Sequence, residues 1–530
     1  MKNSQQVRFK ILPLSLMLFF MMGCSRLSMP WTVAGQSDQE HIPTATLTAA
    51  IELPTGSDTV IDSVEISAIL PAYQADVVSL GDLPQYDISL DIDFYEANFT
   101  GHSRVTYTSN ETEVLDSLFF RLYPNGGKSY GNGHLQVEDV QVDGQDVKTN
   151  LSLGDSVLEV TLPEPLVPGD TVQVDMNFSG EVPKDFGGQE TPAGYGIYNL
   201  SADVMALSGW YPQLAVYDDE GWNLDPVSAI GDSVYSDTAN YSVNVSLDSG
   251  IKLAATGVEV DREKLNGQTR YRYISGPVRD FFLVMSPDFI VSSQMVNGTK
   301  VNSYYLPGHE QAGEIGLQVA ADSLAVFNQR FGTYPYTELD LVEAPMRNAL
   351  GVEYPGIMLV VTSLYDDPSQ PSFTVATAHE VAHQWWYSLV GNDVFDEPWL
   401  DEALATYSSG LYFQDVIGQQ AYEGLTAYWD DRYATIIADG LDDLVTEDLW
   451  YFENSPEHKP YGTIVYSKGA LALEAIREEI GDQAFFEALQ HYYQGNKYLI
   501  AESDNLLGSF ETSAGVSLDS LYEKWLYTHQ

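Results

Sequence analysis

Two histidines stand four residues apart in the segment His379-Glu380-Val381-Ala382-His383. Residues four apart on a helix lie about 40° apart around its axis, so both imidazoles can bind one metal ion. Glu380 lies beside them on the same side of the helix, close enough to hold a water molecule at the metal and accept its proton. The pattern predicts a zinc site that catalyses hydrolysis, with Glu380 as the catalytic base.

A carboxylate downstream completes this ligand set. Eighteen residues separate His383 from Glu402, which lies at the start of the next predicted helix. A helix, a short turn and a returning helix would bring Glu402 back opposite the two histidines. The alternative is an acidic residue that only stabilises the N-terminus of its own helix. We predict one Zn²⁺ per chain, bound by His379, His383 and Glu402, with a fourth position open for water or substrate.

The elements that precede these residues alternate between apolar and polar side chains. Such runs indicate strands with one buried face, and turn residues such as Asp143-Gly144 separate them. The apolar positions in three of these runs are Tyr86, Ile88, Leu90, Ile92 and Phe94; Val172, Val174, Met176 and Phe178; and Tyr241, Val243, Val245 and Leu247. We therefore predict an N-terminal antiparallel β domain over residues 81–290.

After residue 290 the pattern becomes mainly helical, with a short strand at 339–342. The predicted helices are 309–331, a helix that begins near Phe373 and ends at Gly391, a helix from Pro398 towards Ile417, 466–480 and 482–493. The first of them ends before Gly332, and Ser372 is the expected N-cap of the second. The predicted fold is thus multidomain α+β, with a mainly helical domain over 291–530 that positions the metal ligands.

Three segments resemble the gluzincin aminopeptidases, the family of aminopeptidase N and leukotriene hydrolase. The first is HEVAHQWW followed by WLDEALATY, the second is Leu350–Gly356, and the third is Ile464–Ala470. The resemblance extends over roughly residues 81–530. It implies a thermolysin-like catalytic domain that faces the β domain, and it implies peptides as substrates.

The resemblance also implies roles for residues in the second and third segments. Glu353, with Gly351 and Val352 before it, would bind the free α-amino group of a peptide, which makes such enzymes exopeptidases. Tyr466 would donate a hydrogen bond to the tetrahedral oxyanion. A zinc endopeptidase on the same core and a non-catalytic, lipid-anchored binding protein on a peptidase fold remain the alternatives.

This chain departs from the family pattern at several positions. Tyr354 and Leu350 replace an Asn and a Gly of the second segment, and Asp401 replaces the Asn before the ligand Glu402. Ser409 stands where many relatives have a Glu that supports a zinc-bound histidine. The amino-domain glutamine that helps to bind the substrate terminus has no clear equivalent, although Gln213 lies near the expected place. We expect a member of the family that lacks the large helical C-terminal domain of many relatives.

The first 80 residues predict export. Lys2, Arg8 and Lys10 precede an apolar run over 11–22 that ends at Gly23-Cys24. This run is too short for a spanning helix and is typical of a signal peptide. Cys24 is the only cysteine of the chain. It resembles the lipidation site of a bacterial lipoprotein, which would anchor the protein to a membrane of the cell envelope. An ordinary secretory signal is the alternative. Residues 25–80 are predicted to form a flexible tether.

Composition limits the partners further. The chain has 24 Lys and Arg against 76 Asp and Glu, a formal net charge of −52. Such a surface repels nucleic acid and anionic lipid, so we expect neither as a binding partner. With one cysteine there is no intramolecular disulfide, and stability must come from core packing.

Overall fold

The computed structural model describes residues 65–187, 195–232 and 234–529. The predicted signal peptide, Cys24 and the tether up to residue 64 lie outside the described residues. From residue 65 onward, the described residues belong to one compact unit.

The alternation in the first half of the chain builds β-sheets, as predicted. Along β1 (Gln85–Asp93) every second residue from Tyr86 onward is buried, and β8 and β14 show the same alternation. The remaining strands of this region are β2 (Asn98–Thr108), β3 (Leu115–Arg121), β4 (His134–Val142), β5 (Gln145–Asp146), β6 (Thr149–Ser152), β7 (Val157–Leu166), β8 (Thr171–Glu181), β9 (Tyr198–Ser201), β10 (Val204–Leu207), β11 (Gln213–Leu214), β12 (Tyr217–Asp218), β13 (Gly221–Trp222), β14 (Asn240–Asp248), β15 (Lys252–Ala255), β16 (Val258–Leu265), β17 (Gln268–Ile274) and β18 (Leu283–Ser286).

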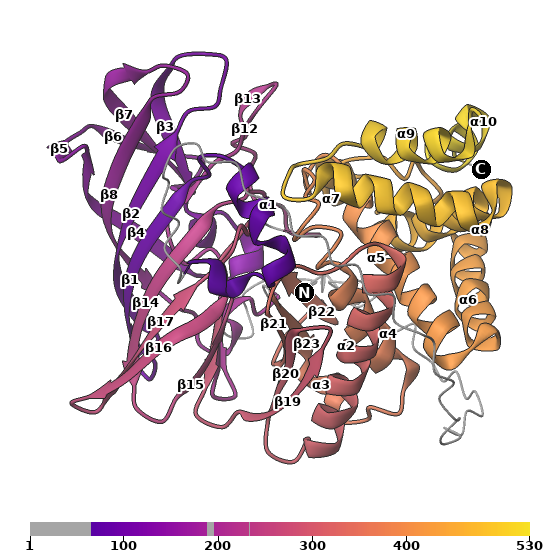
Figure 1. Ribbon diagram of the computed structural model, residues 1–530, viewed down its shortest axis with the longest axis horizontal. Helices are drawn as coiled ribbons and strands as arrows, with labels where there is room; N and C mark the ends of the chain where they lie inside the picture. The colour runs from indigo at the N-terminus through magenta and orange to yellow at the C-terminus, as the bar shows by residue number, and fades with distance from the viewer. Residues whose placement is uncertain (1–64, 188–194, 233, 530) are drawn as a thin grey trace, which may run out of the picture. The chain divides into compact units, whose positions relative to one another are not determined.

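These strands form one large sheet and smaller ones (Figure 1). The large sheet has the order β16-β17-β14-β1-β2-β8-β4-β5, and two four-stranded sheets have the orders β15-β18-β10-β9 and β11-β3-β7-β6. Most pairs are antiparallel, but β1 and β14 run parallel, with Gln85 opposite Asn240. Alternation predicts which face of a strand is buried and says nothing of its neighbour's direction, so this pairing was not predictable.

A five-stranded sheet begins at the predicted domain boundary. Its order is β19-β20-β21-β23-β22, which leaves β22 at an edge. These strands are β19 (Ile290–Val296), β20 (Thr299–Tyr305), β21 (Glu338–Ala344), β22 (Gly351–Tyr354) and β23 (Ile357–Val361). Only a short strand at 339–342 is predicted from the sequence, and it is the middle of β21.

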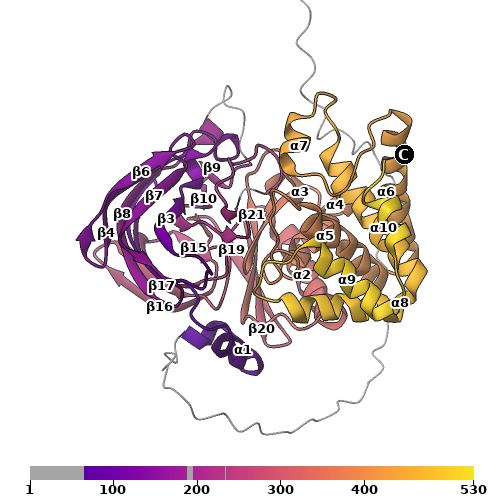
Figure 2. The ribbon, with the colours of Figure 1, turned by 90° about the horizontal axis from the view of Figure 1, so that it is seen from above.

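Helices cover one side of this sheet, where α2 packs on β19 and β20, and α4 packs on β22 and β23 (Figure 2). The helices are α1 (Gln74–Ser79), α2 (Glu310–Arg330), α3 (Thr362–Tyr365), α4 (Pro371–Ala382), α5 (Trp399–Tyr412), α6 (Gln419–Ala438), α7 (Leu449–Asn454), α8 (Gly469–Asn496), α9 (Ser503–Ala514) and α10 (Asp519–Trp525). π-Helical turns at Phe413–Ile417 and Gly462–Lys468 follow α5 and precede α8. Gly481 interrupts α8 with φ +80°, at the break predicted between the last two helices.

Helix α4 is shorter than predicted. It begins at Pro371, so Ser372 lies inside its first turn, and its C-cap is His383 rather than Gly391. The backbone turns sharply beyond His383, because the Ser388 N–H donates to the His383 carbonyl at 2.9 Å and Tyr387 has φ +123°. The sequence from Trp385 to Leu389 contains no glycine or proline that would predict this turn.

Residues 65–80 are folded, which differs from the tether predicted for this stretch. Ala68 and Ile69 are buried, and Ile69 forms a β-bridge with Tyr336 before β21. Lys497, after α8, makes an ion pair with Asp76 of α1 at 2.5 Å. The stretch has no sustained hydrophobic periodicity, and the residues that hold it, such as Tyr336 and Lys497, lie far away in the sequence. The sequence therefore does not predict that it is folded.

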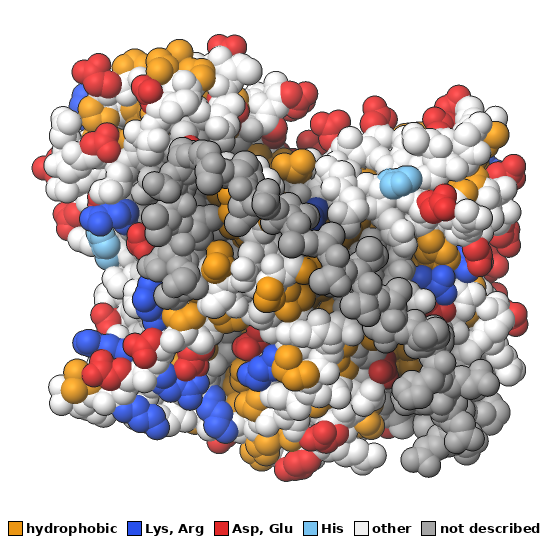
Figure 3. Space-filling model, viewed as in Figure 1, with side chains coloured by type: hydrophobic (Ala, Val, Ile, Leu, Met, Phe, Trp, Pro, Cys, Tyr) orange, Lys and Arg blue, Asp and Glu red, His pale blue; other side chains and the backbone are white. Residues whose placement is uncertain are grey.

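The surface is acidic, as the composition requires. On the face in Figure 3, Asp and Glu side chains occur throughout, whereas Lys and Arg gather over the strands at the lower left, where β16 and β17 lie. Within the described ranges, no helix is both long and apolar enough to cross a bilayer.

Candidate active site

Helices α4 and α5 bring the three predicted metal ligands together. The Nε2 atoms of His379 and His383 are 3.1 Å apart, and Glu402 Oε2 lies 3.1 Å from the first and 3.5 Å from the second. The Glu402 and His383 side chains are buried, and that of His379 is 14% exposed. Two imidazole nitrogens and one carboxylate oxygen that converge from separate helices fit the donor set of a catalytic zinc ion.

Electrostatics keep Glu402 ionised in this cluster. Burial alone raises the pKa of a carboxyl group, but hydrogen bonds from His379 and His383 lower the pKa of Glu402 to about 2. Glu402 also lies in the first turn of α5, where the helix dipole favours negative charge. The carboxylate is therefore available to a cation.

The turn after α4 orients His383. The ring Nδ1 of His383 is 3.0 Å from the Trp386 carbonyl oxygen, which leaves Nε2 to face the cluster. The next residue, Tyr387, holds φ +123°, a backbone conformation that is strained for a residue with a side chain. Arg279 of the β-rich region donates through Nε to the Tyr387 carbonyl at 2.9 Å, and its guanidinium also donates to the Leu499 carbonyl.

Ser409, which replaces the supporting Glu of many relatives, does not take that role. Its hydroxyl donates to the Thr406 carbonyl within α5 at 2.7 Å. The backbone of Trp386 is thus the partner that the structure provides for His383. The fully buried Trp385 and Trp386 are core residues, as their position beside the ligand helix suggests.

Glu380 and Gly351 pack directly against each other. A Cβ atom on Gly351 would lie 2.2 Å from Glu380 Oε1, so only glycine fits at the start of β22. Glu380 is buried, and its Oε2 atom has no hydrogen-bond partner among the described residues. Burial raises the pKa of Glu380 to about 8. A carboxyl group with a raised pKa and a free oxygen beside the ligand cluster fits a general base.

A π-helical turn presents Tyr466 to the same cluster. Its hydroxyl donates to Glu402 Oε1, and its ring stacks on His379 with centroids 5.8 Å apart. Burial raises the pKa of Tyr466 well above its usual range, so the group stays a hydroxyl donor. Lys468 anchors the end of this turn through a fully buried ion pair with Asp442 at 3.0 Å. π-Turns of this kind often occur at functional sites.

The structure also brings Glu353 to the site. Glu353 lies on β22 and is buried. Its carboxylate, that of Glu380 and a ring nitrogen of His383 all lie within 4.8 Å of one another. Val352, one residue earlier, is half-buried and packs against the core.

Asp232, which the sequence did not predict as a site residue, also lies near this cluster. Its carboxyl group shares a hydrogen bond with Glu353 and interacts electrostatically with Glu402 and His383. It lies in a segment between β13 and β14 with no periodic pattern, and only its long-range contacts reveal it. Gln213, the nearest sequence match to the family's glutamine, is instead buried in β11 and donates to the Arg279 carbonyl at 3.2 Å.

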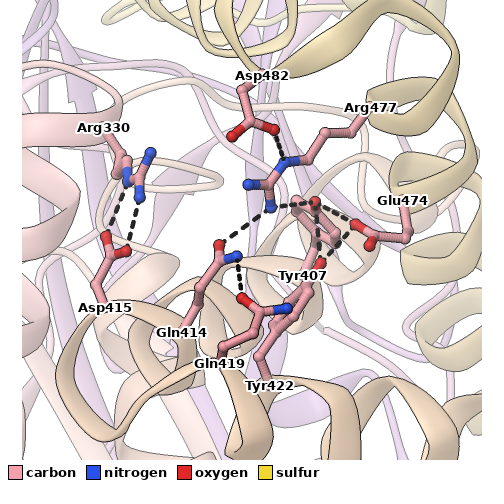
Figure 4. A network of polar contacts seen from close by, with 9 residues as sticks. All are labelled: Arg330, Tyr407, Gln414, Asp415, Gln419, Tyr422, Glu474, Arg477 and Asp482. Carbon is pink, nitrogen blue, oxygen red and sulfur yellow. Dashed lines mark hydrogen bonds and ion pairs between the residues drawn. The ribbon is translucent and has the colours of Figure 1, made fainter.

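A polar network supports the far end of α5 (Figure 4). Tyr407, five residues after Glu402, donates to Glu474 of α8 at 2.7 Å and accepts from Arg477 at 3.2 Å. Arg330 of α2 makes a paired contact with Asp415 of the following π-turn. These contacts join α2, α5 and α8 and fix the direction in which α5 presents Glu402.

Comparison with known families decides the nature of the helical region. Residues 315–525 match the peptidase family M1 domain. The chain contains an M1 peptidase domain. This finding confirms the resemblance inferred from the three sequence segments, because the gluzincin aminopeptidases are the same family.

Curated relatives of the M1 domain are distant and longer. Aminopeptidase M1 of Arabidopsis thaliana is 25% identical over 300 residues, which cover 54% of this chain and 34% of the plant protein. Aminopeptidase 2 of Candida albicans is 22% identical over 474 residues, covering 83% of this chain and 46% of the fungal protein. The chain therefore spans between a third and a half of the length of these relatives.

A solved structure shares the arrangement of the M1 domain and the β-rich region. It is an M1 zinc metallopeptidase from Deinococcus radiodurans, 22% identical, with a TM-score of 0.65 over 85% of this chain and 94% of that chain. The match confirms the predicted fold, in which an N-terminal β domain precedes a mainly helical catalytic domain.

Proposed function

We propose that the protein is a zinc-dependent metallopeptidase that releases residues from the amino terminus of peptides. The observation that carries the proposal is the position of Glu353, whose buried carboxylate lies within 4.8 Å of Glu380 and His383. A substrate α-ammonium group bound there sets its first peptide bond beside the three metal ligands. The relatives named aminopeptidases support the proposal. A variant of the Deinococcus radiodurans metallopeptidase has been solved with a Tyr-Ser-Ala substrate.

The zinc ion would be bound by His379, His383 and Glu402. When bound, zinc polarises a carbonyl group and makes water acidic enough to ionise near neutral pH. Glu380, which is not a ligand, accepts the proton of the attacking water and passes it to the leaving amine. Tyr466 donates its hydroxyl to the oxygen that becomes negative in the transition state.

Edge strand β22 aligns the substrate. It pairs with β23 on one side only within its sheet, so an extended peptide can add to its other side through backbone hydrogen bonds. Glu353 then forms a charge-assisted hydrogen bond with the α-ammonium group in a buried site. Because β22 holds the peptide backbone and Glu353 holds its amino terminus, the entropic cost of reaching the reactive geometry is lower.

Substrates with free and blocked amines test this proposal. The zinc-loaded protein is assayed on leucine amide and N-acetyl-leucine amide, with and without a chelator. We expect cleavage of the free amide, a fall of about 100-fold on acetylation, and loss of activity with chelator that zinc restores. Mass spectrometry of a digested decapeptide should show stepwise loss from the amino terminus. Early internal fragments from an acetylated decapeptide would identify an endopeptidase, and no cleavage of any peptide would identify a binding protein.

We further propose that the protein is exported and anchored to a membrane by a lipid on Cys24. The support is the short apolar run before this single cysteine. One lipid chain gives only reversible binding, so the anchor requires more than one chain or a second contact. Phase separation in detergent should place the wild type in the detergent phase and Cys24→Ser in the aqueous phase, with Ser25→Ala as the control. An unmodified Cys24 in intact-mass analysis would leave an ordinary secretory signal as the explanation.

A further inference from the structure

The π-helical turn Gly462–Lys468, which presents Tyr466, is held at its start by helix α6. Arg432 of α6 donates through Nη2 to the Thr463 hydroxyl oxygen at 2.8 Å and to the Gly462 carbonyl at 3.3 Å. A π-turn holds one residue more than the α-helical turn that it replaces. A return to α-helical hydrogen bonding would shift the register by one residue, which is about 100° of rotation around the axis. Tyr466 therefore keeps its direction only while the turn keeps its π register.

The end of the turn lies directly against helix α5. A Cβ atom on Gly469, the first residue of α8, would lie 2.6 Å from the Ala403 Cβ atom. Ala403 follows the predicted metal ligand Glu402, and the Tyr466 hydroxyl donates to the carboxylate of Glu402. Only glycine fits at this contact, so the turn and the ligand helix touch without an intervening side chain. A displacement of the turn therefore moves Tyr466 relative to the metal ligands.

Lys468, the last residue of the turn, is fully buried and makes three hydrogen bonds. Its ammonium nitrogen donates to Asp442 Oδ1 at 3.0 Å, to the Asp443 carbonyl at 2.6 Å and to the Thr528 carbonyl at 3.0 Å. An ammonium group has three N–H donors, and each of them has an acceptor here. Two acceptors belong to the loop after α6 and one to the segment after α10. Lys468 is therefore fixed from several directions at once.

The acceptors of Lys468 are themselves held in place. Tyr433 of α6 donates its hydroxyl to Asp442 Oδ2 at 3.1 Å, and the Val445 N–H donates to the Leu526 carbonyl at 3.0 Å. These bonds join α6, the loop that follows it and the segment after α10. An apolar side chain in place of Lys468 would fill the same buried volume, but it would not set the register of the turn, because apolar contacts are not directional.

We propose that Lys468 is a positioning residue for the reaction, because its three hydrogen bonds hold the π register in which Tyr466 faces the metal ligands. This inference rests on the proposed function, in which Tyr466 donates to the oxygen that becomes negative in the transition state. Lys468 acts through Tyr466 and not on the substrate. Without its hydrogen bonds, the Tyr466 hydroxyl is no longer held where that charge develops. The loss therefore falls on kcat and much less on KM.

A double-mutant cycle between Lys468 and Tyr466 tests the inference. Steady-state kinetics give kcat and KM for leucine amide with the zinc-loaded wild type, Lys468→Met, Tyr466→Phe and the double variant. We expect Lys468→Met to lower kcat about 10- to 100-fold, because a misplacement of about 1 Å can cost about 100-fold, and to change KM less than about 3-fold. In the Tyr466→Phe background, the same substitution should lower kcat less than about 3-fold, since the group that Lys468 positions is absent.

Lys497→Met is the matched control. Lys497 also makes a largely buried ion pair, with Asp76, and its side chain is 11% exposed, but it lies outside the π-turn. Its replacement should lower the thermal midpoint and change kcat less than about 3-fold in either background. Hydrogen exchange of the zinc-free proteins gives a measurement without turnover. The amides of Gly462–Lys468 should exchange faster in Lys468→Met than in the wild type, and at the wild-type rate in Lys497→Met.

A second variant separates position from stability. Lys468→Met alone leaves the charge of Asp442 buried without its ammonium partner, which is strongly destabilising. Lys468→Met combined with Asp442→Asn removes that charge. We expect this combination to have a higher thermal midpoint than Lys468→Met and an equally low kcat. It takes the place of Lys468→Met in the cycle if the single variant does not fold.

The outcomes separate this inference from the proposed function. If Tyr466→Phe lowers kcat and the folded Lys468 variant does not, Lys468 is not a positioning residue and the proposed function stands. Equal losses of kcat in both backgrounds would show a general structural role and overturn the inference. If the wild type cleaves leucine amide but Tyr466→Phe leaves kcat unchanged, the inference fails and the peptidase activity stands. A zinc-loaded wild type that cleaves no amide or peptide overturns both proposals.

Discussion

The two sides of the active site are assembled over very different lengths of chain. The metal side, defined as His379, Glu380, His383 and Glu402, comes from two consecutive helices within 24 residues. The carboxyl side, defined as Asp232 and Glu353, joins a segment of the β-rich region to an edge strand 121 positions later. Helix geometry encodes the first locally, whereas only the tertiary fold assembles the second. The metal side should therefore tolerate changes in the β-rich region, whereas the carboxyl side should be sensitive to them.

The largest effect expected on the metal side is that of Glu402→Ala. Losing one of three protein ligands should reduce zinc content from about one ion per chain to a small fraction, since even indirect partners change affinity ~10–100-fold. Elemental analysis after dialysis measures this change. The control is Asp396→Ala, an exposed residue of the segment between the two helices. Full zinc occupancy in Glu402→Ala would mean that the third ligand lies elsewhere.

Glu380→Gln separates chemistry from metal binding within the metal side. The substitution keeps the size of the side chain beside Gly351 but removes the proton acceptor, so kcat should fall ~10²–10⁴-fold or more. Zinc content should stay at the wild-type level, because Glu380 is not a ligand. Loss of zinc together with activity would show that this carboxylate binds the metal directly.

Tyr466→Phe tests the oxyanion donor that lies between the two sides. Removing one such donor typically costs ~10²–10³-fold in kcat, and KM for leucine amide should change much less, because the hydrogen bond strengthens in the transition state. Steady-state kinetics separate the two parameters. Tyr461→Phe is the matched control, because its ring contacts Tyr466 and its hydroxyl has no hydrogen-bond partner among the described residues. An unchanged kcat in Tyr466→Phe would remove the tyrosine from the mechanism.

The smallest effect on activity is expected from Arg279→Lys, which tests how far the metal side is independent of the β-rich region. Three different nitrogens of Arg279 donate to the Tyr387, Ser236 and Leu499 carbonyls, and the single ammonium nitrogen of a lysine cannot take all three positions. Each buried carbonyl left without a donor costs roughly 1–3 kcal/mol. The thermal midpoint should fall by several degrees while kcat changes only a few-fold. A loss of zinc affinity as large as in Glu402→Ala would contradict the independence of the metal side.

The contrast between the two sides also explains what the sequence could predict. His379, His383 and Glu380 follow from helical spacing, and Glu402 from a spacing that a helical hairpin satisfies. Glu353 and Tyr466 required a family resemblance, since a buried Glu on a strand and one tyrosine among 34 carry no signal of their own. Asp232 has no such signal either, because its position depends on the hydrogen bonds from Ser228 and Ala229 to Glu453.

The same distinction applies to the fold. Alternation predicted the buried faces of β1, β8 and β14, and helix 310–330 ended near Gly332 as expected. The early end of α4 and the π-turn before Tyr466 depend on tertiary contacts such as Arg279 with Tyr387 and Lys468 with Asp442. Such contacts leave no local pattern, so they became visible only in the folded chain.

The hydrogen bonds from Ser228 and Ala229 to Glu453 of α7 have a consequence for recombination and protein engineering. The border near residue 290 looks like a natural crossover point, because the chain changes there from one architecture to another. A crossover at this point would nevertheless separate Asp232 from Glu353 and Glu453 from its two donors. A chimera that takes its first half from one homologue and its second half from another would inherit the metal centre intact from one parent and the two partners of the carboxyl side from different parents.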